Sequence, residues 1–402
     1  MPIAYTSTRR EKLHEVLTAN REVAVVVTRW LLCLLSLMTI SYSASAAVLP
    51  EERADVMFHR YDGGGVTVDG PSILVRKSIG QSVSVKANYY VDSISSASVD
   101  VVSTASPYTE ERTETSLGMD YLNNKTLMTL SYTDSSESDY IAETLSFNIS
   151  HEMFGDLTTV TLGYSVGNDD IFNNTDPSVQ HGAKRQNYRL GLTQILTKNS
   201  LLGVNFETIT DEGFLGSPYR TYRFSDGTTF GRAAEIYPGT RTSNAISFRL
   251  KYFLPYRAAL NGEFRYFRDT WGINASNIEI GYTHPLKADW VFDVHYRYYT
   301  QAAADFYSDL FTREGEQNFL ARDKELSTFQ DHTVGIGVSY EFQSSAWQFL
   351  EKGSLNFSFD HIRFNYDDYR DETAAGGSLP FGKEPFYSFT ANVIMAYLSI
   401  WY

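Results

Sequence analysis

The sequence predicts an all-β protein, a single transmembrane antiparallel β-barrel of about 16 strands, and three observations indicate it. Apolar and polar residues alternate with a period of two through most of the chain after residue 46. The connections between these segments alternate between short turns and long loops. The final segment keeps alternating up to Tyr402, so the expected last strand ends on an aromatic residue. Such a strand can pair with the first one and close the wall.

The composition suits a barrel better than a bundle of membrane-spanning helices. The chain has 402 residues, of which 20% are charged and 14% aromatic, and its mean hydropathy is −0.28. Barrel strands have a weak apolar signal because their lipid-facing residues alternate with polar lumen-facing ones. One large barrel accounts for this length without a linker, an internal repeat or a second domain.

The only long apolar run, residues 30–40, predicts a secretory signal peptide. Arg29 precedes the run and Ala-Ser-Ala follows at 44–46, which supplies a basic flank and a small-residue cleavage site. A membrane anchor is the alternative, but the run is shorter than the roughly 18 residues that a spanning helix needs. The predicted domains are an N-terminal extension with signal peptide at 1–46 and an outer-membrane β-barrel at 47–402.

The charge and the single cysteine exclude several classes of function. The formal net charge is −14, and residues 1–46 carry five basic and three acidic residues, so their removal leaves −16. A chain this acidic is not expected to bind nucleic acid. Cys33 lies in the predicted signal peptide, so we expect no disulfide, no catalytic thiol and no cysteine-bound metal in the mature chain. No cofactor is expected.

The alternation assigns each predicted strand an apolar and a polar face. In 290–298, Trp290, Phe292, Val294, Tyr296 and Tyr298 oppose Asp293, His295 and Arg297. A wide barrel places such charges in its wet lumen and the apolar set in lipid, whereas a soluble β-sandwich, the alternative, would put the charges in water. Paired aromatics at the strand ends predict an interfacial girdle: Tyr89-Tyr90, Tyr252-Phe253, Tyr298-Tyr299, Phe386-Tyr387 and Trp401-Tyr402.

The connection lengths favour the membrane barrel. Short turns are expected near 80, 123–124, 154–156, 198–199, 255 and 285–286, and longer connections around 93–110, 134–139, 168–184, 211–243, 268–274, 300–330 and 365–383. Short periplasmic turns and long outer loops are typical of such barrels. The count gives about 16 strands with both termini periplasmic.

Two features at the ends of the barrel are less regular. Residues 54–61 are either the first strand or a periplasmic lead-in, so 14 strands is the alternative count. The apolar face also changes parity between Val393 and Met395, which predicts a bulge in the last strand.

Several strings carry a resemblance to a known family. They occur in order at 70–78, 88–98, 135–140, 194–198, 218–220, 238–243, 267–273, 296–301, 304–307 and 321–327, and Tyr296-Arg297-Tyr298-Tyr299-Thr300-Gln301 is among the strongest. The chain resembles a Gram-negative family of outer-membrane proteins catalogued as a domain of unknown function. The resemblance implies an outer-membrane barrel without an established activity. Relatives encoded beside small envelope redox proteins and flavin-transferring enzymes further imply an accessory role in envelope redox chemistry.

Inward-facing charges are the first candidate site. They could set an electrostatic field across a pore, as in ion-selective channels. Equally, they could form salt bridges that hold the wall rigid, with Arg249 facing Glu263 and Arg265 facing Glu279. The alternation places eleven charged residues on this face: Lys86, Arg189, Glu207, Arg249, Lys251, Glu263, Arg265, Glu279, Asp293, Arg297 and Glu341.

The loops at 211–243 and 300–330 are the second candidate. A barrel of 16 strands encloses an aqueous channel, and one of these loops folding inward would form a constriction. Arginines of the first loop would then attract anions, namely Arg220, Arg223, Arg232 and Arg241. The alternative is a solvated outer loop.

Metal binding and catalysis are weaker hypotheses. Two oxygen-rich clusters carry ligands that hard cations prefer, but neither has the spacing of a calcium loop, so polar turns are the preferred interpretation. These clusters are Asp169, Asp170, Asn173, Asn174 and Asp176, and Asp367, Asp368, Asp371 and Glu372. A barrel hydrolase would rest on His295, which has Asp293 and Arg297 beside it. No serine is placed as an evident nucleophile, so we predict that the protein is not an enzyme.

The predicted function is that of a porin-like outer-membrane barrel that passes, or helps to pass, a small solute or envelope component. The alternative is a structural or accessory barrel for an envelope redox or assembly complex. The expected partners are outer-membrane lipid and lipopolysaccharide, the barrel-assembly machinery through the C-terminal strand ending at Tyr402, and an envelope redox protein.

Overall fold

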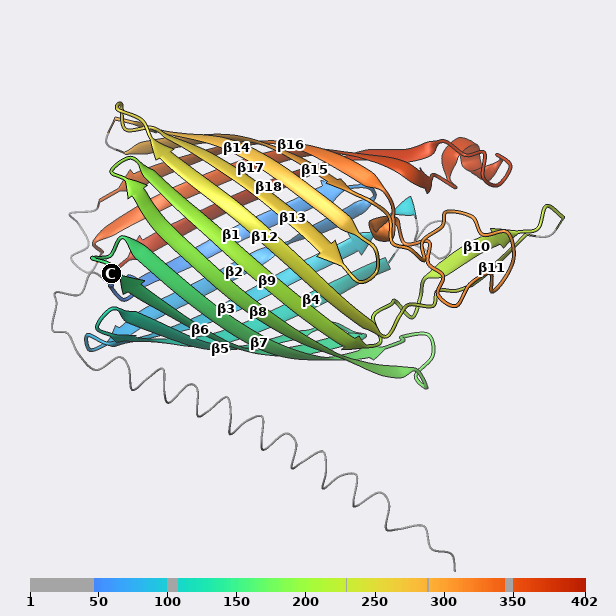
Figure 1. Cartoon of the computed structure of the whole chain (residues 1–402), viewed down its shortest axis with the longest axis horizontal. Coiled ribbons are helices and arrows are strands. Elements are labelled where there is room, and N and C mark those ends of the chain that lie inside the picture. Colours follow the sequence, from blue (N-terminus) through green and yellow to red (C-terminus); the bar gives the residue numbers. More distant parts are fainter. Residues whose placement is uncertain (1–46, 100–107, 229, 288, 344–349) are drawn as a thin grey trace, which may run out of the picture. The chain divides into compact units, whose positions relative to one another are not determined.

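The computed structural model describes residues 47–99, 108–228, 230–287, 289–343 and 350–402. Within these residues, sixteen antiparallel strands close into one barrel (Figure 1). The predicted fold class and the higher strand count are therefore confirmed. The predicted signal peptide, in 1–46, lies outside the described residues.

Neighbouring strands in the sequence are neighbours in the wall, except that β9 pairs with β12 because the small β10–β11 hairpin lies outside the barrel. The barrel strands are β1 (Arg53–Gly63), β2 (Val66–Ile79), β3 (Val83–Ser96), β4 (Tyr108–Asn123), β5 (Thr126–Ser136), β6 (Tyr140–Met153), β7 (Thr158–Phe172), β8 (Gln180–Thr197), β9 (Ser200–Gly213), β12 (Thr240–Phe253), β13 (Ala259–Asp269), β14 (Asn274–Leu286), β15 (Trp290–Gln301), β16 (Phe329–Phe342), β17 (Lys352–Arg370) and β18 (Phe386–Trp401). The hairpin consists of β10 (Thr221–Ser225) and β11 (Phe230–Ala234). No helix in the described ranges is long and apolar enough to cross a membrane.

The two ends of the barrel have different connections. Tight turns at one end use residues with left-handed backbone, such as Gly80 (φ 67°) and Asn124 (φ 52°), which glycine and asparagine adopt most readily. The opposite end carries the long connections at 214–239, 302–328 and 371–385. This is the asymmetry that the sequence predicts. Residues 54–61 belong to β1, so they are a first strand and not a lead-in.

The barrel closes through an unbroken ladder between β1 and β18, from Arg53 opposite Trp401 to Gly63 opposite Ala391. The bulge predicted between Val393 and Met395 is therefore wrong. Both side chains lie on the same face of β18, and the apparent change of parity arises because apolar residues also occupy that face. The irregularity lies instead in β17, between Asn365 and Arg370.

Large apolar side chains are exposed along the outside of the wall. Ile280 is 60% exposed, Ile336 53% and Val294 46%. A soluble sheet would bury such a row, whereas a membrane barrel exposes it to lipid. Along the strands, the residues that alternate with these apolar side chains face the other side of the wall, where the ion pairs described below are found. The apolar rows therefore do not meet in a dry core between two stacked sheets.

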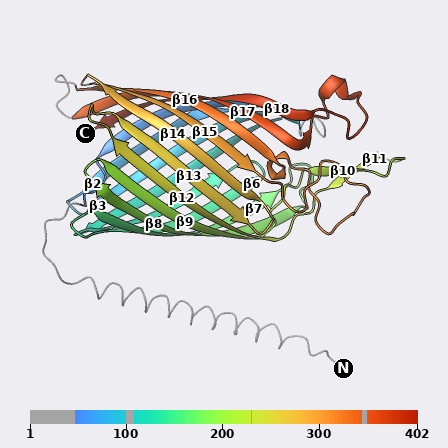
Figure 2. The same ribbon diagram turned by 45° about the horizontal axis from the view of Figure 1, so that its top comes forward.

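Buried apolar side chains gather instead at the long-loop end. One cluster contains Trp271, Phe306 and Leu326, and another contains Tyr222, Phe311 and Leu320. Bridges from Phe224 to Phe311 and from Ile236 to Leu320 join the 214–239 and 302–328 connections. In both ribbon views these connections lie beyond the ends of the barrel strands (Figures 1 and 2). We call residues 214–239, 302–328 and 371–385 the cap.

Candidate functional site

Some of the predicted inward charges form ion pairs between strands. Nε of Arg249 lies 2.7 Å from Oε2 of Glu263, which is the expected pair. Arg265 does not pair with Glu279. Its Nη2 lies 3.3 Å from Oε2 of Glu207 on β9, two strands away, because the residue opposite it on β12 is the small Ser247. Arg189 approaches the same Glu207 carboxylate at 3.3 Å.

The remaining predicted wall residues divide into two groups. Arg297 pairs with Asp331 at 3.1 Å, and Asp293 accepts a hydrogen bond of 2.5 Å from the Thr283 hydroxyl. Within the described residues, no ion pair shorter than 4.0 Å is formed by Lys86, Lys251, Glu279 or Glu341.

One quarter of the inner wall carries an excess of positive charge. The strand registers place the paired side chains of β8, β9, β12 and β13 on one common face. In the described part of these strands that face carries six basic and four acidic residues: Arg185, Arg189, Arg241, Arg249, Lys251 and Arg265, with Glu207, Asp211, Glu263 and Asp269.

The four arginines predicted to attract anions all have carboxylate partners. Arg220 pairs with Asp323, and Arg232 with Glu372. Nη2 of Arg241, at the start of β12, lies 2.6 Å from Oδ2 of Asp269. The inward-folded constriction loop stays a hypothesis: Arg223 and Arg232 lie on the β10–β11 hairpin beyond the ends of the barrel strands, Arg241 lies on β12, and each of the four guanidinium groups has a carboxylate partner.

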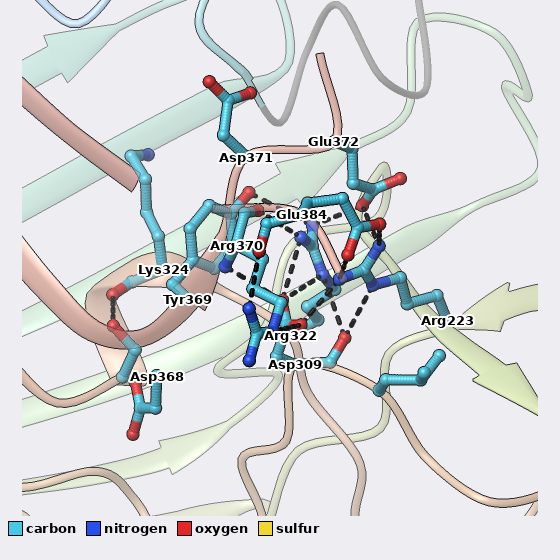
Figure 3. Close-up of polar contacts among 12 residues, drawn as sticks. Arg223, Asp309, Arg322, Lys324, Asp368, Tyr369, Arg370, Asp371, Glu372 and Glu384 are labelled. Atoms are coloured by element: carbon cyan, nitrogen blue, oxygen red, sulfur yellow. Dashed lines mark hydrogen bonds and ion pairs between the residues drawn. The ribbon is translucent and has the colours of Figure 1, made fainter. Parts of the chain in front are cut away.

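Arg223 is a fully buried member of an ionic network (Figure 3). Its Nη1 lies 2.6 Å from Oε1 of Glu384, and its Nη2 lies 2.6 Å from Oδ2 of Asp309. Arg322 lies 3.0 Å from Asp309 and 2.7 Å from Glu372. These residues come from all three segments of the cap, so the network joins the segments to one another. The sequence gives no sign of it, because loop charges have no periodicity.

Arg322 links this network to a partly buried acid, Glu235. Its backbone N–H donates to Oε1 of Glu235 at 2.7 Å, and the Tyr237 hydroxyl donates to Oε2 at 2.9 Å. Burial, together with the nearby Asp323 carboxylate, raises the pKa of Glu235 to about 6. The same burial raises the pKa of Tyr237 above its ordinary value, so this hydroxyl remains a donor.

Aromatic rings line the inner wall of β15 to β18 near the cap. Phe329 lies 5.6 Å from Tyr299 and 5.2 Å from Tyr366, measured between ring centroids, and Phe364 stacks on Phe389 at 4.6 Å. The predicted lipid girdle is therefore only part of the pattern. Of the Tyr298-Tyr299 pair, Tyr299 faces this interior group, and the period-two alternation carries the signal that could have shown it.

A cavity of about 350 Å³ lies where the cap meets the wall. Arg241, Arg265 and Tyr299 contribute from the wall, and Asp323 and Glu325 from the cap. The rest of its lining is mainly apolar or amide: Leu215, Tyr237, Phe267, Trp271, Ile273, Ala275, Ser276, Asn277, Gln301 and Leu326. The cavity therefore combines charged side chains with aromatic surface.

The candidate hydrolase residue has an acid partner on another strand. Nε2 of His295 lies 3.5 Å from Oδ1 of Asp360 on β17, above Gly335, and Asp293 lies two residues away on the same face of β15. No serine hydroxyl in the described residues bonds to His295. The structure also shows a second histidine group that the sequence pattern does not identify. In it, Nε2 of His59 lies 2.7 Å from Oδ1 of Asp92 and 2.9 Å from the Tyr90 hydroxyl.

The oxygen-rich clusters form side-chain turns. Oδ1 of Asn173 accepts the backbone N–H of Thr175 at 2.8 Å, and Oδ1 of Asp371 accepts that of Thr373 at 2.9 Å. These are the local bonds that asparagine and aspartate make in turns. No group of three metal-ligating side chains is found in the described ranges.

The sequence comparison decides the family. A family model described as "Protein of unknown function (DUF3570)" matches residues 98–361. The chain belongs to this family. The match confirms the resemblance to an uncharacterised family, and no curated protein matches the chain.

Solved structures with a similar fold are distant from this DUF3570 chain. A bacterial polysaccharide outer-membrane secretin shares 7% identity with a TM-score of 0.47, and the alignment covers 88% of this chain and 100% of the secretin. The CymD monoaromatic hydrocarbon channel shares 8% at 0.42, covering 88% and 89%. A Pseudomonas aeruginosa FadL homologue shares 10% at 0.41, covering 88% and 90%. Likeness at this level transfers no activity. The closed antiparallel wall and its apolar exterior themselves make this chain a porin-like barrel of the outer-membrane type.

Proposed function

We propose that this protein is an outer-membrane porin-like barrel that passes, or helps to pass, a small polar solute. The observation that carries the proposal is the division of the wall into two faces. Exposed Ile280, Val294 and Ile336 suit contact with acyl chains, whereas the opposite face bears cross-strand ion pairs such as Arg249–Glu263. Sixteen strands enclose a lumen wide enough for water.

The proposed orientation places the short turns and both termini of the chain in the periplasm and the cap outside the cell. The lengths of the connections support it, since the cap segments are much longer than the turns. The partners are outer-membrane lipid and lipopolysaccharide, and the barrel-assembly machinery would engage the last strand, β18. An envelope redox partner stays a prediction, which crosslinking in intact cells tests.

Planar-bilayer recording tests the transport function. Purified full-length chain should give discrete conductance steps, and removal of the β10–β11 hairpin should raise the step size because it loosens the cap. A matched preparation with Arg313→Ala, an exposed cap residue, should conduct like the parent chain. Silence under varied voltage and salt would contradict the proposal.

A further inference from the structure

Arg265 is the cation of the cap–wall cavity that still has hydrogen-bond donors available for a ligand. A guanidinium carries five N–H donors. In the described residues, Arg265 makes one ionic contact, from Nη2 to Glu207 at 3.3 Å, and that carboxylate also serves Arg189. The side chain is 39% exposed and lines the cavity, so its other donors are available to a ligand.

Glu325 is the matching anion. It lies in the short 3₁₀ helix η1 (Lys324–Leu326), its side chain is 70% exposed, and its ion pair with Lys324 is long, at 3.9 Å. Its backbone is nevertheless fixed. The Gln301 amide donates to the carbonyl oxygens of Glu325 and Ser327 at 2.9 and 2.8 Å, and Asp323 caps the helix. The Glu325 side chain therefore lines the cavity from an anchored backbone, and its ion pair with Lys324 is too long to occupy the carboxylate fully.

The other two charged side chains of the cavity are already paired. Arg241 directs both Nε and Nη2 at Oδ2 of Asp269, at 2.8 and 2.6 Å, and stacks on Trp271 with its guanidinium 4.5 Å from the ring centroid. The Asp323 carboxylate pairs with Arg220 and accepts the capping hydrogen bond of the helix η1. One cation and one anion are left for a ligand.

The surface between these charges is apolar and aromatic. Phe267 and Tyr299 lie on the wall side of the cavity, and the guanidinium of Arg265 lies 5.9 Å from the Phe267 ring centroid. A volume of about 350 Å³ lies at the small end of the range for ligand pockets, which excludes a large ligand.

We propose that this cavity binds a small zwitterionic solute with an apolar side group, of the α-amino acid or short-peptide class. The solute carboxylate contacts Arg265, its ammonium contacts Glu325, and its apolar group packs on Phe267 and Tyr299. A simple anion would satisfy Arg265 and meet repulsion from Glu325, and a simple cation would meet the reverse. The inference rests on the proposed function, since it names the substrate class of the channel.

Three probes with one ring and different charges test the proposal. Titration calorimetry on the full chain in detergent compares phenylalanine with phenylpropionate, which lacks the ammonium, and with phenethylamine, which lacks the carboxylate. One charge-assisted hydrogen bond is worth about tenfold in affinity. Phenylalanine is expected to bind about tenfold more tightly than either analogue.

Two variants assign each charge to its residue. Arg265→Gln should weaken phenylalanine binding about tenfold and remove its advantage over phenethylamine. Glu325→Gln should remove its advantage over phenylpropionate. Arg249→Gln is the matched control, because Arg249 lies on the same inner wall, pairs with Glu263 and does not line this cavity. Its affinities should equal those of the parent chain.

Equal affinities for the three probes, tighter binding of a singly charged one, or no binding at all would overturn the inference. Bilayer recording on the same preparation separates it from the channel proposal. If the protein conducts but does not prefer the zwitterion, the binding site is rejected and the channel proposal stands. If it prefers the zwitterion but does not conduct, the channel proposal is rejected and the binding site stands.

Discussion

Arg223 on β10 and Glu384 in the connection before β18 are 161 residues apart in the sequence, and their side chains meet at 2.6 Å in a buried ion pair. The same guanidinium contacts Asp309. One side chain therefore joins the three segments of the cap. Removing one partner of a buried ion pair leaves an uncompensated charge, which costs more than the pair itself contributes.

Replacement of Arg223 should release the cap and leave the barrel intact. We expect Arg223→Met to destabilise the cap locally by about 3–5 kcal/mol, because Glu384 loses its cation and Asp309 keeps only the pairing with its other arginines. Limited proteolysis and amide hydrogen exchange would show faster cleavage and exchange at 214–239 and 302–328. Arg313→Ala, on the exposed cap surface, is the control. Unchanged protection of the cap in Arg223→Met would contradict this role.

The cap should also lose stability as the pH rises through about 6. Burial raises the pKa of Glu235 from 4.5 to about 6, so the folded cap favours the protonated acid. The stabilisation of the cap by protonated Glu235 is complete below about pH 4.5 and is lost as the pH rises past 6. The free energy of cap unfolding should fall by about 2 kcal/mol over this range. Exchange of the Arg322 amide, which donates to Glu235, measures it after correction for the intrinsic rate. Glu235→Gln should remove this pH dependence, and a pH-independent parent chain would contradict the prediction.

A side chain at position 335 should disturb the inner wall. A Cβ on Gly335 would lie 2.0 Å from Cε1 of His295 and 2.2 Å from Oδ1 of Asp360. We expect Gly335→Ala to lower the free energy of unfolding by about 1–3 kcal/mol, as overpacking does. Denaturant unfolding of the barrel measures this difference. Gly281→Ala is the matched control, because the nearest atom to its Cβ would be 3.6 Å away. Equal losses in the two variants would show that the crowding at Gly335 is not what matters.

The sequence predicts the barrel well because its signals are local. Period-two alternation and the sorting of connection lengths need only neighbouring residues, and both agree with the structure from β1 to β18. The predicted bulge failed for the same reason, since Val393 and Met395 are apolar but share the inner face of an unbroken ladder. The alternation of apolar and polar residues does not by itself distinguish an apolar side chain that faces the lumen from a lipid-facing one that a bulge has shifted by one position.

The site is harder to predict because its contacts join distant segments. Arg265 contacts Glu207, 58 residues away, by passing over Ser247, and this depends on the register of two pairings at once. The partners of Arg223 lie 86 and 161 residues away in irregular loops. The sequence groups the four arginines around one loop, but it does not reveal the carboxylates that pair with them.

Single-cysteine labelling along β15 tests most directly whether the two faces of the wall meet lipid and water. The chain has one cysteine, so each variant is built with Cys33→Ser. In membranes, a water-soluble maleimide should label a cysteine that replaces Asp293, His295 or Arg297. A fluorophore attached to a cysteine that replaces Phe292, Val294 or Tyr296 should instead be quenched by brominated lipid. Uniform labelling, or the reverse alternation, would contradict a lipid-facing apolar exterior around a wet lumen.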